Sequence, residues 1–385
     1  MSTLATGTTL AQRSLAPDLT RGAMLLIIAL ANVHFFLYGF EPGIRNYPGA
    51  PDALDRLVIV LQMCLVDGRA YPMFAALFGY GLVQMTRRFQ DSGLPLSDQR
   101  KLLRRRGFWM LVIGFLHALF LFSGDIIGAY GLLAALLGGM VLRASNRTLI
   151  IVAGVWLIPT VFMGGAAGAP AGTEDAKLSF NEAQFMTAAV FRVTEWIIAT
   201  PLQAILLLPT AFLLGVWAGR RRFLDEPEKH QRLLRRVAVG GIGIAVIGGF
   251  PAGMVAAQNW DLFPWNGAAG AVHAVSGFAG AFGYAAAIAC WAVALQGKTG
   301  GWFSTALAAC GQRSMTCYLW QSVVFVAVLA SYGGGLGDQF STSQAALLAI
   351  ATWVSGLGLA EVMRRRGHRG PGEVFLRRMT YAGHR

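Results

Sequence analysis

The feature that most constrains this chain is a repeated series of long apolar segments. A helix needs about 20 apolar residues to cross the hydrocarbon layer of a bilayer. Ten segments have this character, at 22–40, 57–86, 107–123, 126–142, 148–164, 197–219, 237–257, 267–296, 304–332 and 343–363. The second, eighth and ninth exceed the minimum, so we expect them to tilt, kink or begin at the interface. The sequence predicts an all-α, polytopic transmembrane helix bundle, with 1–385 as a single integral-membrane domain.

Composition excludes several other classes. Only 13% of the 385 residues are charged, whereas a soluble domain carries about a quarter. The net charge of +13 is typical of nucleic-acid binding, but the basic residues form short runs between apolar segments. Such runs contact lipid headgroups, so we expect the lipid bilayer as partner and no nucleic acid. All four cysteines lie inside apolar segments without a CxxC pair, so neither a disulfide framework nor a metal site is predicted.

The distribution of Lys and Arg predicts the orientation. With the N-terminus in the cytoplasm, 26 of the 32 fall in inner segments and 4 in outer ones. The basic segments 86–106 and 220–236 and the tail 364–385 would then be cytoplasmic, and 165–196 would lie outside. We therefore expect ten spans with both termini in the cytoplasm, and the first span uncleaved. The remaining two, Arg69 and Arg313, fall inside apolar segments.

Two ionisable groups fall within the stretch Gly114–Gly131, GFLHALFLFSGDIIGAYG. His117 lies in its first apolar arm and Asp125 at the break between the arms. Such groups are costly in hydrocarbon, so each is a functional-site hypothesis. The alternative is a histidine bonded to a neighbouring helix and an aspartate that caps the next helix.

The segment 57–86 carries a second polar group of residues, LVDGRAYP. Pro72 has no N–H and frees the carbonyl of Gly68, which predicts a kink there. Asp67 and Tyr71 share one helical face, whereas Arg69 points elsewhere. Asp67 and Arg69 therefore need partners on other helices, either around a wet cavity or as a structural buried pair.

The segment 304–332 contains CGQRSMTCYLWQS, in which Arg313, Thr316 and Gln321 lie within one helical sector. An unpaired arginine at the bilayer centre costs at least roughly 2.5–3.5 kcal/mol. Arg313 should therefore face a carboxylate, backbone carbonyls or a bound anion. Asp67 is its expected internal partner by depth, and a ligand phosphate is the alternative.

The first span adds two candidates. Asn32 lies within it, and Arg21 lies at its inner mouth, where anionic lipid could also hold it. His34 is two residues from Asn32, so both cannot face the interior. His273 lies among glycines and alanines and is expected to be a satisfied core histidine. Together the ionisable groups extend from mid-membrane to the outer face, which suits a cavity open to the outside.

Five stretches together resemble a known family: DLTRGAMLLIIALAN, FAALFGYGL, GFLHALFLFSGDIIGAYGLL, CGQRSMTCYLWQS and GPGEVFLRRMTY. They are similar to the YeiB-like family of bacterial inner-membrane proteins, classed under domain of unknown function 418. The resemblance runs from Asp18 to about Tyr381. The matched positions include Arg21, Asn32, His117, Asp125, Arg313, Thr316 and Gln321. His34 falls outside the family pattern, and relatives often carry Asn in place of Cys317.

The resemblance implies a reaction, because the family is similar in architecture to a superfamily of membrane acyltransferases. Those enzymes move an acyl group from cytosolic acyl-CoA to an acceptor across the bilayer, and a membrane histidine is central. By this resemblance His117 would be the general base or the acyl-carrying nucleophile, oriented by Asp125. Arg313 would hold the phosphate or pantetheine end of acyl-CoA, and the basic segments would steer it. The acceptor would be a small molecule or a glycan.

The rival function is a proton-coupled secondary transporter of a small solute. His117, Asp67, Asp125 and Arg313 would then form the path, with Pro72 at a gate. Transporters are often built from two related halves, and no repeat of RG, LFGYG or HxxxxxxxGD joins the two halves of this chain. A membrane scaffold without activity is disfavoured by the number of buried ionisable groups. A homo-oligomeric assembly is left open.

Overall fold

The computed structural model describes residues 15–41, 43–49, 52–168, 178–296 and 301–382. All regular structure in these ranges is helical, as predicted. Parts of the predicted outer segment 165–196 and of the tail 364–385 lie outside the described residues. The longer helices are α1 (Leu15–Val33), α2 (Ala53–Leu65), α3 (Ala70–Asp91), α4 (Leu96–Phe120), α5 (Ile127–Arg143), α6 (Asn146–Ala167), α8 (Phe185–Leu202), α9 (Pro209–Arg220), α10 (Gln231–Ala256), α11 (Asn266–Ala294), α12 (Trp302–Gln312), α13 (Ser314–Val328), α14 (Thr342–Arg365) and α15 (Pro371–Tyr381).

Helix length and composition indicate a membrane protein. Among the described residues, seven helical stretches are long and apolar enough to cross a bilayer: Leu15–Phe36, Ala53–Asp91, Asn146–Ala167, Phe185–Leu207, Pro227–Ala256, Asn266–Ala294 and Thr342–Arg365. Two shorter apolar helices, Ile127–Arg143 and Ser314–Val328, correspond to further predicted spans. Most of the apolar segment 107–123 lies in the second half of α4, which ends at Phe120. The first half of the same helix holds the basic run 100–106. The count of ten spans stays a prediction.

Two of the three over-long segments are broken, and the third, α11, is one helix of 29 residues. The break between α2 and α3 covers residues 66–69, with Gly68 in the left-handed region at φ +75°. Pro72 lies in the first turn of α3, where a missing N–H costs nothing, so the predicted kink at Pro72 is wrong. Glycine is required at the break because a Cβ on Gly68 would lie 3.1 Å from the His273 ring.

The other break, at Arg313, separates α12 from α13. A Cβ on Gly311 would lie 1.8 Å from the carbonyl oxygen of Asp18, and one on Gly22 would lie 2.1 Å from that of Leu307. α12 therefore runs in the opposite sense to α1 along this contact. The chain then turns, since Gln321 on α13 reaches the carbonyl of Leu25 farther along α1. The expected mid-membrane place of Arg313 assumed a single helix over 304–332, and the structure divides that segment at Arg313 itself.

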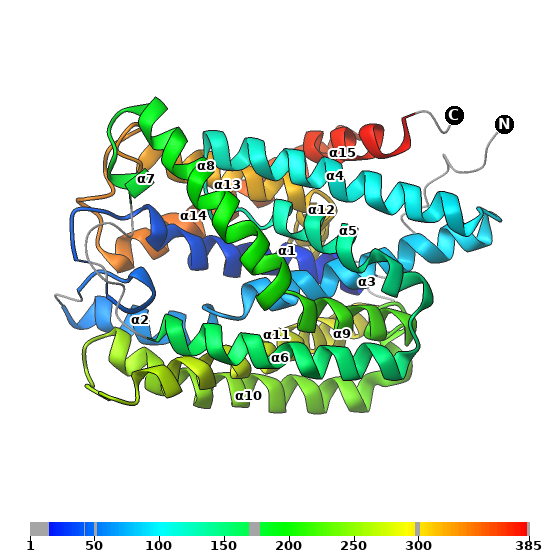
Figure 1. Cartoon of the computed structure of the whole chain (residues 1–385), viewed down its shortest axis with the longest axis horizontal. Coiled ribbons are helices and arrows are strands. Elements are labelled where there is room, and N and C mark those ends of the chain that lie inside the picture. Colours follow the sequence, from blue (N-terminus) through cyan, green and yellow to red (C-terminus); the bar gives the residue numbers. More distant parts are fainter. Residues whose placement is uncertain (1–14, 42, 50–51, 169–177, 297–300, 383–385) are drawn as a thin grey trace.

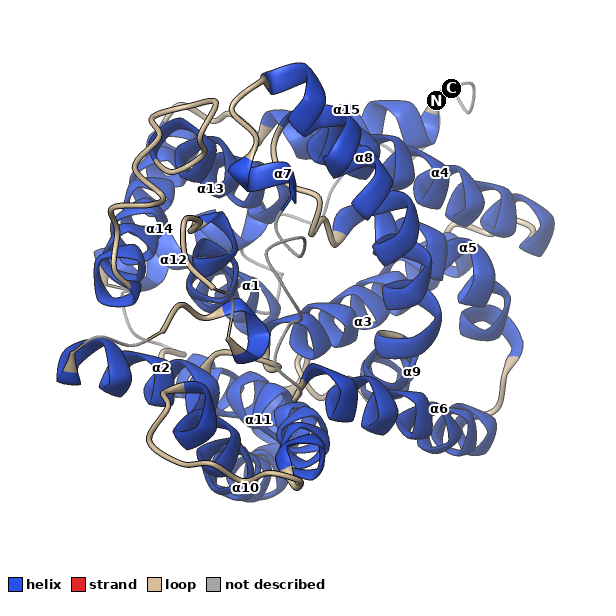
Figure 2. Cartoon of the chain, turned by 60° about the vertical axis from the view of Figure 1, so that its left-hand side comes forward, coloured by secondary structure: helices blue, strands red, loops and turns tan. Residues whose placement is uncertain are grey.

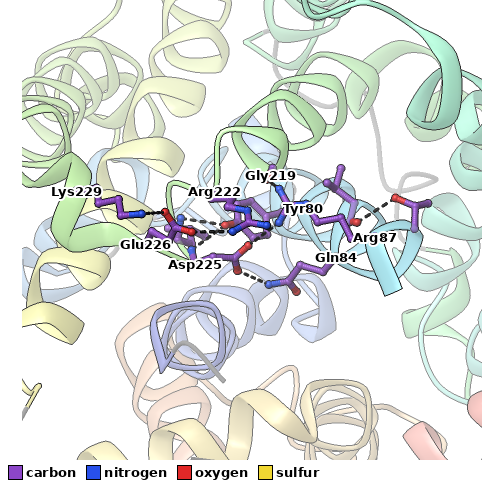
Figure 3. A network of polar contacts seen from close by, with 11 residues as sticks. Tyr80, Gln84, Arg87, Gly219, Arg222, Asp225, Glu226 and Lys229 are labelled. Carbon is purple, nitrogen blue, oxygen red and sulfur yellow. Dashed lines mark hydrogen bonds and ion pairs between the residues drawn. The ribbon is translucent and has the colours of Figure 1, made fainter. Parts of the chain in front are cut away.

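The bundle has two ends along its long axis (Figure 1). We call one of them the basic end, because the basic runs 100–106 and 220–222 and the arginines of α15 lie near its turns 92–95, 144–145 and 221–226. There Asp225 accepts hydrogen bonds from Arg87 at 3.0 Å and Gln84 at 2.6 Å, while the Tyr80 hydroxyl accepts the N–H of Asp225 at 2.8 Å. Figure 3 shows this cluster, in which Tyr80, Gln84, Arg87, Gly219, Arg222, Asp225, Glu226 and Lys229 are labelled. The cluster ties α3 to the turn that follows α9.

The opposite end carries the segments 37–41, 43–49, 257–265 and 329–341 (Figures 1 and 2). Figure 1 shows that α4 and α5 stop short of this end, so their connecting turn 121–126 is set back into the bundle. An aromatic cluster covers this turn: Phe36 lies 5.1 Å from Phe122, 4.8 Å from Phe180 and 5.5 Å from Phe325 between ring centroids. We call these four rings the aromatic roof.

Orientation can be tested with single cysteines. We expect Gln90→Cys, exposed near the end of α3, to react with an impermeant maleimide only after cells are opened. Asn259→Cys, exposed on the segment 257–265, should react in intact cells. Both belong in a background without the four native cysteines, three of which are buried. Labelling of both positions from one side would contradict the predicted topology.

Candidate functional site

His117 and Asp125 meet across the α4–α5 turn. The Nδ1 atom of His117 lies 2.9 Å from Oδ1 of Asp125, and both side chains are 0% exposed. The other oxygen of Asp125 accepts the N–H of Gly128 at 2.6 Å, in the first turn of α5. Asp125 therefore both caps α5 and contacts the imidazole, as the structural alternative expected, while a functional role of the pair stays a prediction. The cap fixes the carboxylate in place to orient the ring.

The second ring nitrogen has a partner from a distant part of the chain. Nε2 of His117 lies 2.8 Å from the hydroxyl oxygen of Ser322 on α13. When Asp125 is ionised it can only accept, and in that state Nδ1 carries the proton and Nε2 accepts from the Ser322 hydroxyl. Sequence analysis missed Ser322 because nothing in the spacing links it to a residue 205 positions away.

A buried arginine holds the end of α4 that carries His117. Arg192 is fully buried and donates from Nε to the carbonyl of Ala118 at 3.1 Å and from Nη2 to that of Leu119 at 2.8 Å. A cation is favourable at a helix C-terminus, where carbonyls are unpaired. Arg192 falls in the predicted outer segment 165–196, and nothing in the sequence indicated these buried contacts. The structure instead gives it a role in positioning the last turn of α4.

Arg313 does not meet Asp67, so that expected pairing is wrong. Its Nη1 donates to the carbonyl of Ala309 at 3.0 Å, and its Nε and Nη2 donate to that of His368 at 3.2 and 2.5 Å. Backbone carbonyls, one of the three alternatives, are thus its partners. Nearby, Thr316 donates to Oε2 of Glu373 at 2.6 Å. Both residues fasten the tail and α15 to α13.

Asp67 and Arg69 find partners across helices at the α2–α3 break. Oδ2 of Asp67 lies 2.7 Å from the Tyr47 hydroxyl. Arg69 is fully buried and donates to the carbonyl of Ala245 at 2.6 Å, with Nη1 2.7 Å from Nε2 of His273. This cluster joins α2, α10 and α11, as a structural core would. His273 is a satisfied core histidine in this arrangement.

An inner cavity of about 690 Å³ lies at the basic end. Four helices each contribute an arginine to its lining: Arg21 from α1, Arg88 from α3, Arg106 from α4 and Arg377 from α15. Asp91 is the acidic residue among the lining side chains. The Nε of Arg106 is buried and has no hydrogen-bond partner among the described residues. The excess of guanidinium groups suits an anionic ligand.

α15 closes one side of this inner cavity. The ring centroid of Phe375 on α15 lies 6.0 Å from that of Trp109 on α4. Glu373 of α15 accepts the N–H of Met315 at 2.7 Å. Arg377 and Tyr381 of the same helix line the cavity. The tail, which the sequence presented only as a basic cytoplasmic segment, is therefore part of the cavity wall.

An outer cavity of about 320 Å³ lies nearer the opposite end. Its polar lining comes from Asn32, Arg45, Tyr71, Gln203 and His273. A polar cavity of this kind was expected from the sequence, and its opening to the outer face of a membrane stays a prediction. The inner cavity was not anticipated, because its arginines stand in runs typical of orientation signals.

The two cavities share three lining residues, Ile28, Ile126 and Tyr318. We call this trio the constriction. The Tyr318 ring centroid lies 5.1 Å from that of His117, so the His117–Asp125 pair sits directly behind the constriction.

The candidate residues from the sequence thus fall into three groups. His117 and Asp125 form a contact behind the constriction, while Arg21, Asn32 and Tyr71 line cavities. The remaining candidates, bonded within the protein, are Asp67, Arg69, Arg313, Thr316 and Gln321. His34 contacts the carbonyl of Arg45 at 3.2 Å and stacks on Tyr47.

The fold and the site define a helical membrane protein with two polar cavities that meet beside a buried His–Asp pair. Residues 218–383 match the family model described as "Protein of unknown function (DUF418)", which confirms the resemblance to this family over that part of the chain. The chain is also 27% identical over 339 residues to "Uncharacterized protein YxaH" of Bacillus subtilis (strain 168), covering 80% of this chain and 78% of that protein. The matched family region contains Ser322 and α15, whereas His117 and Asp125 lie before its first residue.

Proposed function

We propose that this chain is an integral-membrane acyltransferase of the bacterial cytoplasmic membrane. It would move an acyl group from cytosolic acyl-CoA to a small-molecule or glycan acceptor at or across the bilayer. The observation that carries the proposal is the place of the His117–Asp125 pair, behind a constriction between an arginine-lined cavity and a second cavity on the other side.

The inner cavity suits the donor. Coenzyme A carries several phosphate charges, and a guanidinium group binds phosphate oxygens in a two-pronged fashion. Arg106 and Arg377 would meet these phosphates at the basic end, which the predicted topology places in the cytoplasm. The lining towards the constriction includes Phe78 and Tyr130, whose rings stack at 5.4 Å. This aromatic wall would hold the thin pantetheine arm and bring the thioester towards Tyr318.

The His117–Asp125 pair supplies the proton chemistry. With Asp125 accepting from Nδ1, the lone pair of Nε2, which faces the Ser322 hydroxyl, can take a proton from an attacking hydroxyl or amine. The same nitrogen can return that proton to the sulfur of the leaving coenzyme A. Asp125 stabilises the imidazolium formed between the two steps. The acceptor would enter from the outer cavity, whose polar lining includes Asn32 and Gln203.

A second candidate function, solute transport, is favoured by a different observation. Two cavities that meet at a shared set of residues are compatible with a transporter that alternates between open states. Helices broken within the bundle, here at 66–69 and Arg313, also recur at transporter binding sites. In that case Tyr318 would be a gate, and His117 a proton carrier.

The two functions are separated by measuring coenzyme A release. Purified full-length protein is incubated with acetyl-, octanoyl- and palmitoyl-CoA, and free coenzyme A and donor affinity are both measured. Acyl transfer or slow hydrolysis releases coenzyme A from at least one donor. If the protein neither binds nor cleaves any of the three, acyl transfer is contradicted, and proton-driven uptake into proteoliposomes becomes the assay.

A further inference from the structure

We propose that Ser322 is the nucleophile that carries the acyl group, with His117 as its base. This inference rests on the proposed acyl transfer and adds a covalent intermediate to it. Asp125, His117 and Ser322 form a continuous hydrogen-bonded chain of 2.9 and 2.8 Å, and all three are buried. The order carboxylate, imidazole, hydroxyl is the arrangement that activates a serine for attack on a carbonyl carbon.

The Ser322 hydroxyl does not make the local backbone bond that several other helical hydroxyls of this bundle make. A buried serine or threonine inside a helix commonly donates to the carbonyl four residues earlier, which satisfies it at no cost in packing. Five helical threonines do so here: Thr20, Thr160, Thr194, Thr352 and Thr380. Ser322 is instead turned towards Nε2 of His117 on α4.

The surroundings of Ser322 suit a covalent carrier. Tyr318, one helical turn earlier on the same face of α13, lines both the inner and the outer cavity. An ester on Ser322 would therefore be accessible from either side through movement of one ring. The aromatic roof, including Phe325 three residues farther along α13, covers the site towards the opposite end. Excluding water protects an ester intermediate from hydrolysis.

The proposed reaction has two balanced steps. In the first, Ser322 Oγ attacks the thioester carbonyl while its proton passes to Nε2 of His117; the C–S bond breaks, and the coenzyme A sulfur leaves with that proton. In the second, an acceptor hydroxyl or amine gives its proton to Nε2 and attacks the ester carbonyl. The C–O bond to Ser322 then breaks, and Oγ recovers the proton. No electrons are gained or lost in either step.

A covalent carrier explains how the donor and acceptor can be used from different cavities. Coenzyme A can leave the inner cavity before the acceptor enters the outer one, so both never need to be bound at once. The kinetics should then be of the ping-pong type, with a burst of coenzyme A approaching about one per chain when acceptor is absent.

The test is to trap the acyl-enzyme. Full-length protein is incubated with radiolabelled acetyl-, octanoyl- or palmitoyl-CoA without acceptor, denatured in acid, digested and analysed by mass spectrometry. We expect the label on the peptide containing Ser322, stable to neutral hydroxylamine as an oxygen ester. Ser322→Ala should lose both label and burst. Ser322→Cys should keep the label as a thioester, which neutral hydroxylamine removes.

Ser276→Ala is the matched control, because Ser276 is a buried helical serine that donates to the carbonyl of His273 in its own helix. It should keep label and burst. Normal coenzyme A release by Ser322→Ala, or label on His117 in place of Ser322, would overturn this inference and leave acyl transfer standing. If Ser322→Ala fails to fold, the change in hydroxylamine sensitivity of Ser322→Cys decides the matter. No coenzyme A release by the wild type with any of the donors would overturn both.

Discussion

His117→Gln is expected to lower the rate of acyl transfer by roughly 10²–10⁴-fold, the usual contribution of a general base. The glutamine amide has a size and hydrogen-bonding capacity close to those of imidazole, so it can still contact Asp125 and Ser322. It cannot accept a proton near neutral pH, and the transfer loses its base. Because His117 lines neither cavity, acyl-CoA affinity should change little.

The measurement pairs acyl-CoA affinity with coenzyme A release for wild type and variant. His34→Gln is the matched control, since His34 is also buried but contacts the carbonyl of Arg45 and the Tyr47 ring. It should keep the wild-type rate. A His117→Gln protein that transfers acyl groups at full rate would remove His117 from the mechanism. If neither form binds acyl-CoA and the variant loses proton-driven uptake, the transporter is favoured.

Arg106→Gln is expected to weaken acyl-CoA binding by about 10- to 100-fold, because a hydrogen bond to a charged group contributes about 1.5–3 kcal/mol. Arg106 lines the inner cavity, and its buried Nε has no hydrogen-bond partner among the described residues. Its replacement therefore breaks no contact of that nitrogen within the protein, and the thermal stability should be retained.

Arg104→Gln is the matched control for this variant. Arg104 is exposed on the same helix and does not line the inner cavity. Affinities of acyl-CoA and of free coenzyme A are measured for both variants over a range of salt concentrations. We expect Arg106→Gln to bind both ligands more weakly and with a smaller salt dependence, whereas Arg104→Gln should resemble the wild type. Equal losses in the two variants would indicate general attraction to the basic end and no phosphate contact at Arg106.

The two variants separate binding from chemistry. His117→Gln should leave affinity intact and remove turnover, whereas Arg106→Gln should weaken affinity and leave the chemical step intact at saturating donor. A transporter that does not bind acyl-CoA would show neither pattern in these assays.

The sequence indicated that some arginines need partners, but it did not indicate which partners they have. The sequence predicted a bonded partner for Arg313, because an unpaired arginine inside an apolar segment is costly. Its compensation proved to be the carbonyls of Ala309 and His368. Arg106 and Arg377 stand in basic runs that look like orientation signals, and only the packing of α15 against α4 brings both to one cavity.

The position of a helix break was likewise only partly predictable from the sequence. The sequence predicted a kink in 57–86 from Pro72, whereas the break lies at 66–69, where Gly68 has a left-handed backbone. Glycine adopts either sign of φ without a clash, so sequence alone does not say which glycine will do so.

By itself the sequence determined the class of protein, because apolar length, helix formation and charge placement are local properties that a bilayer constrains strongly. It also determined that His117 and Asp125 could meet, since a short turn brings residues eight positions apart together. The tertiary structure alone decided that Ser322 completes that contact, that the tail walls a cavity, and that Tyr318 divides two cavities. These contacts join helices far apart in sequence, and their partners are set by packing across the whole bundle.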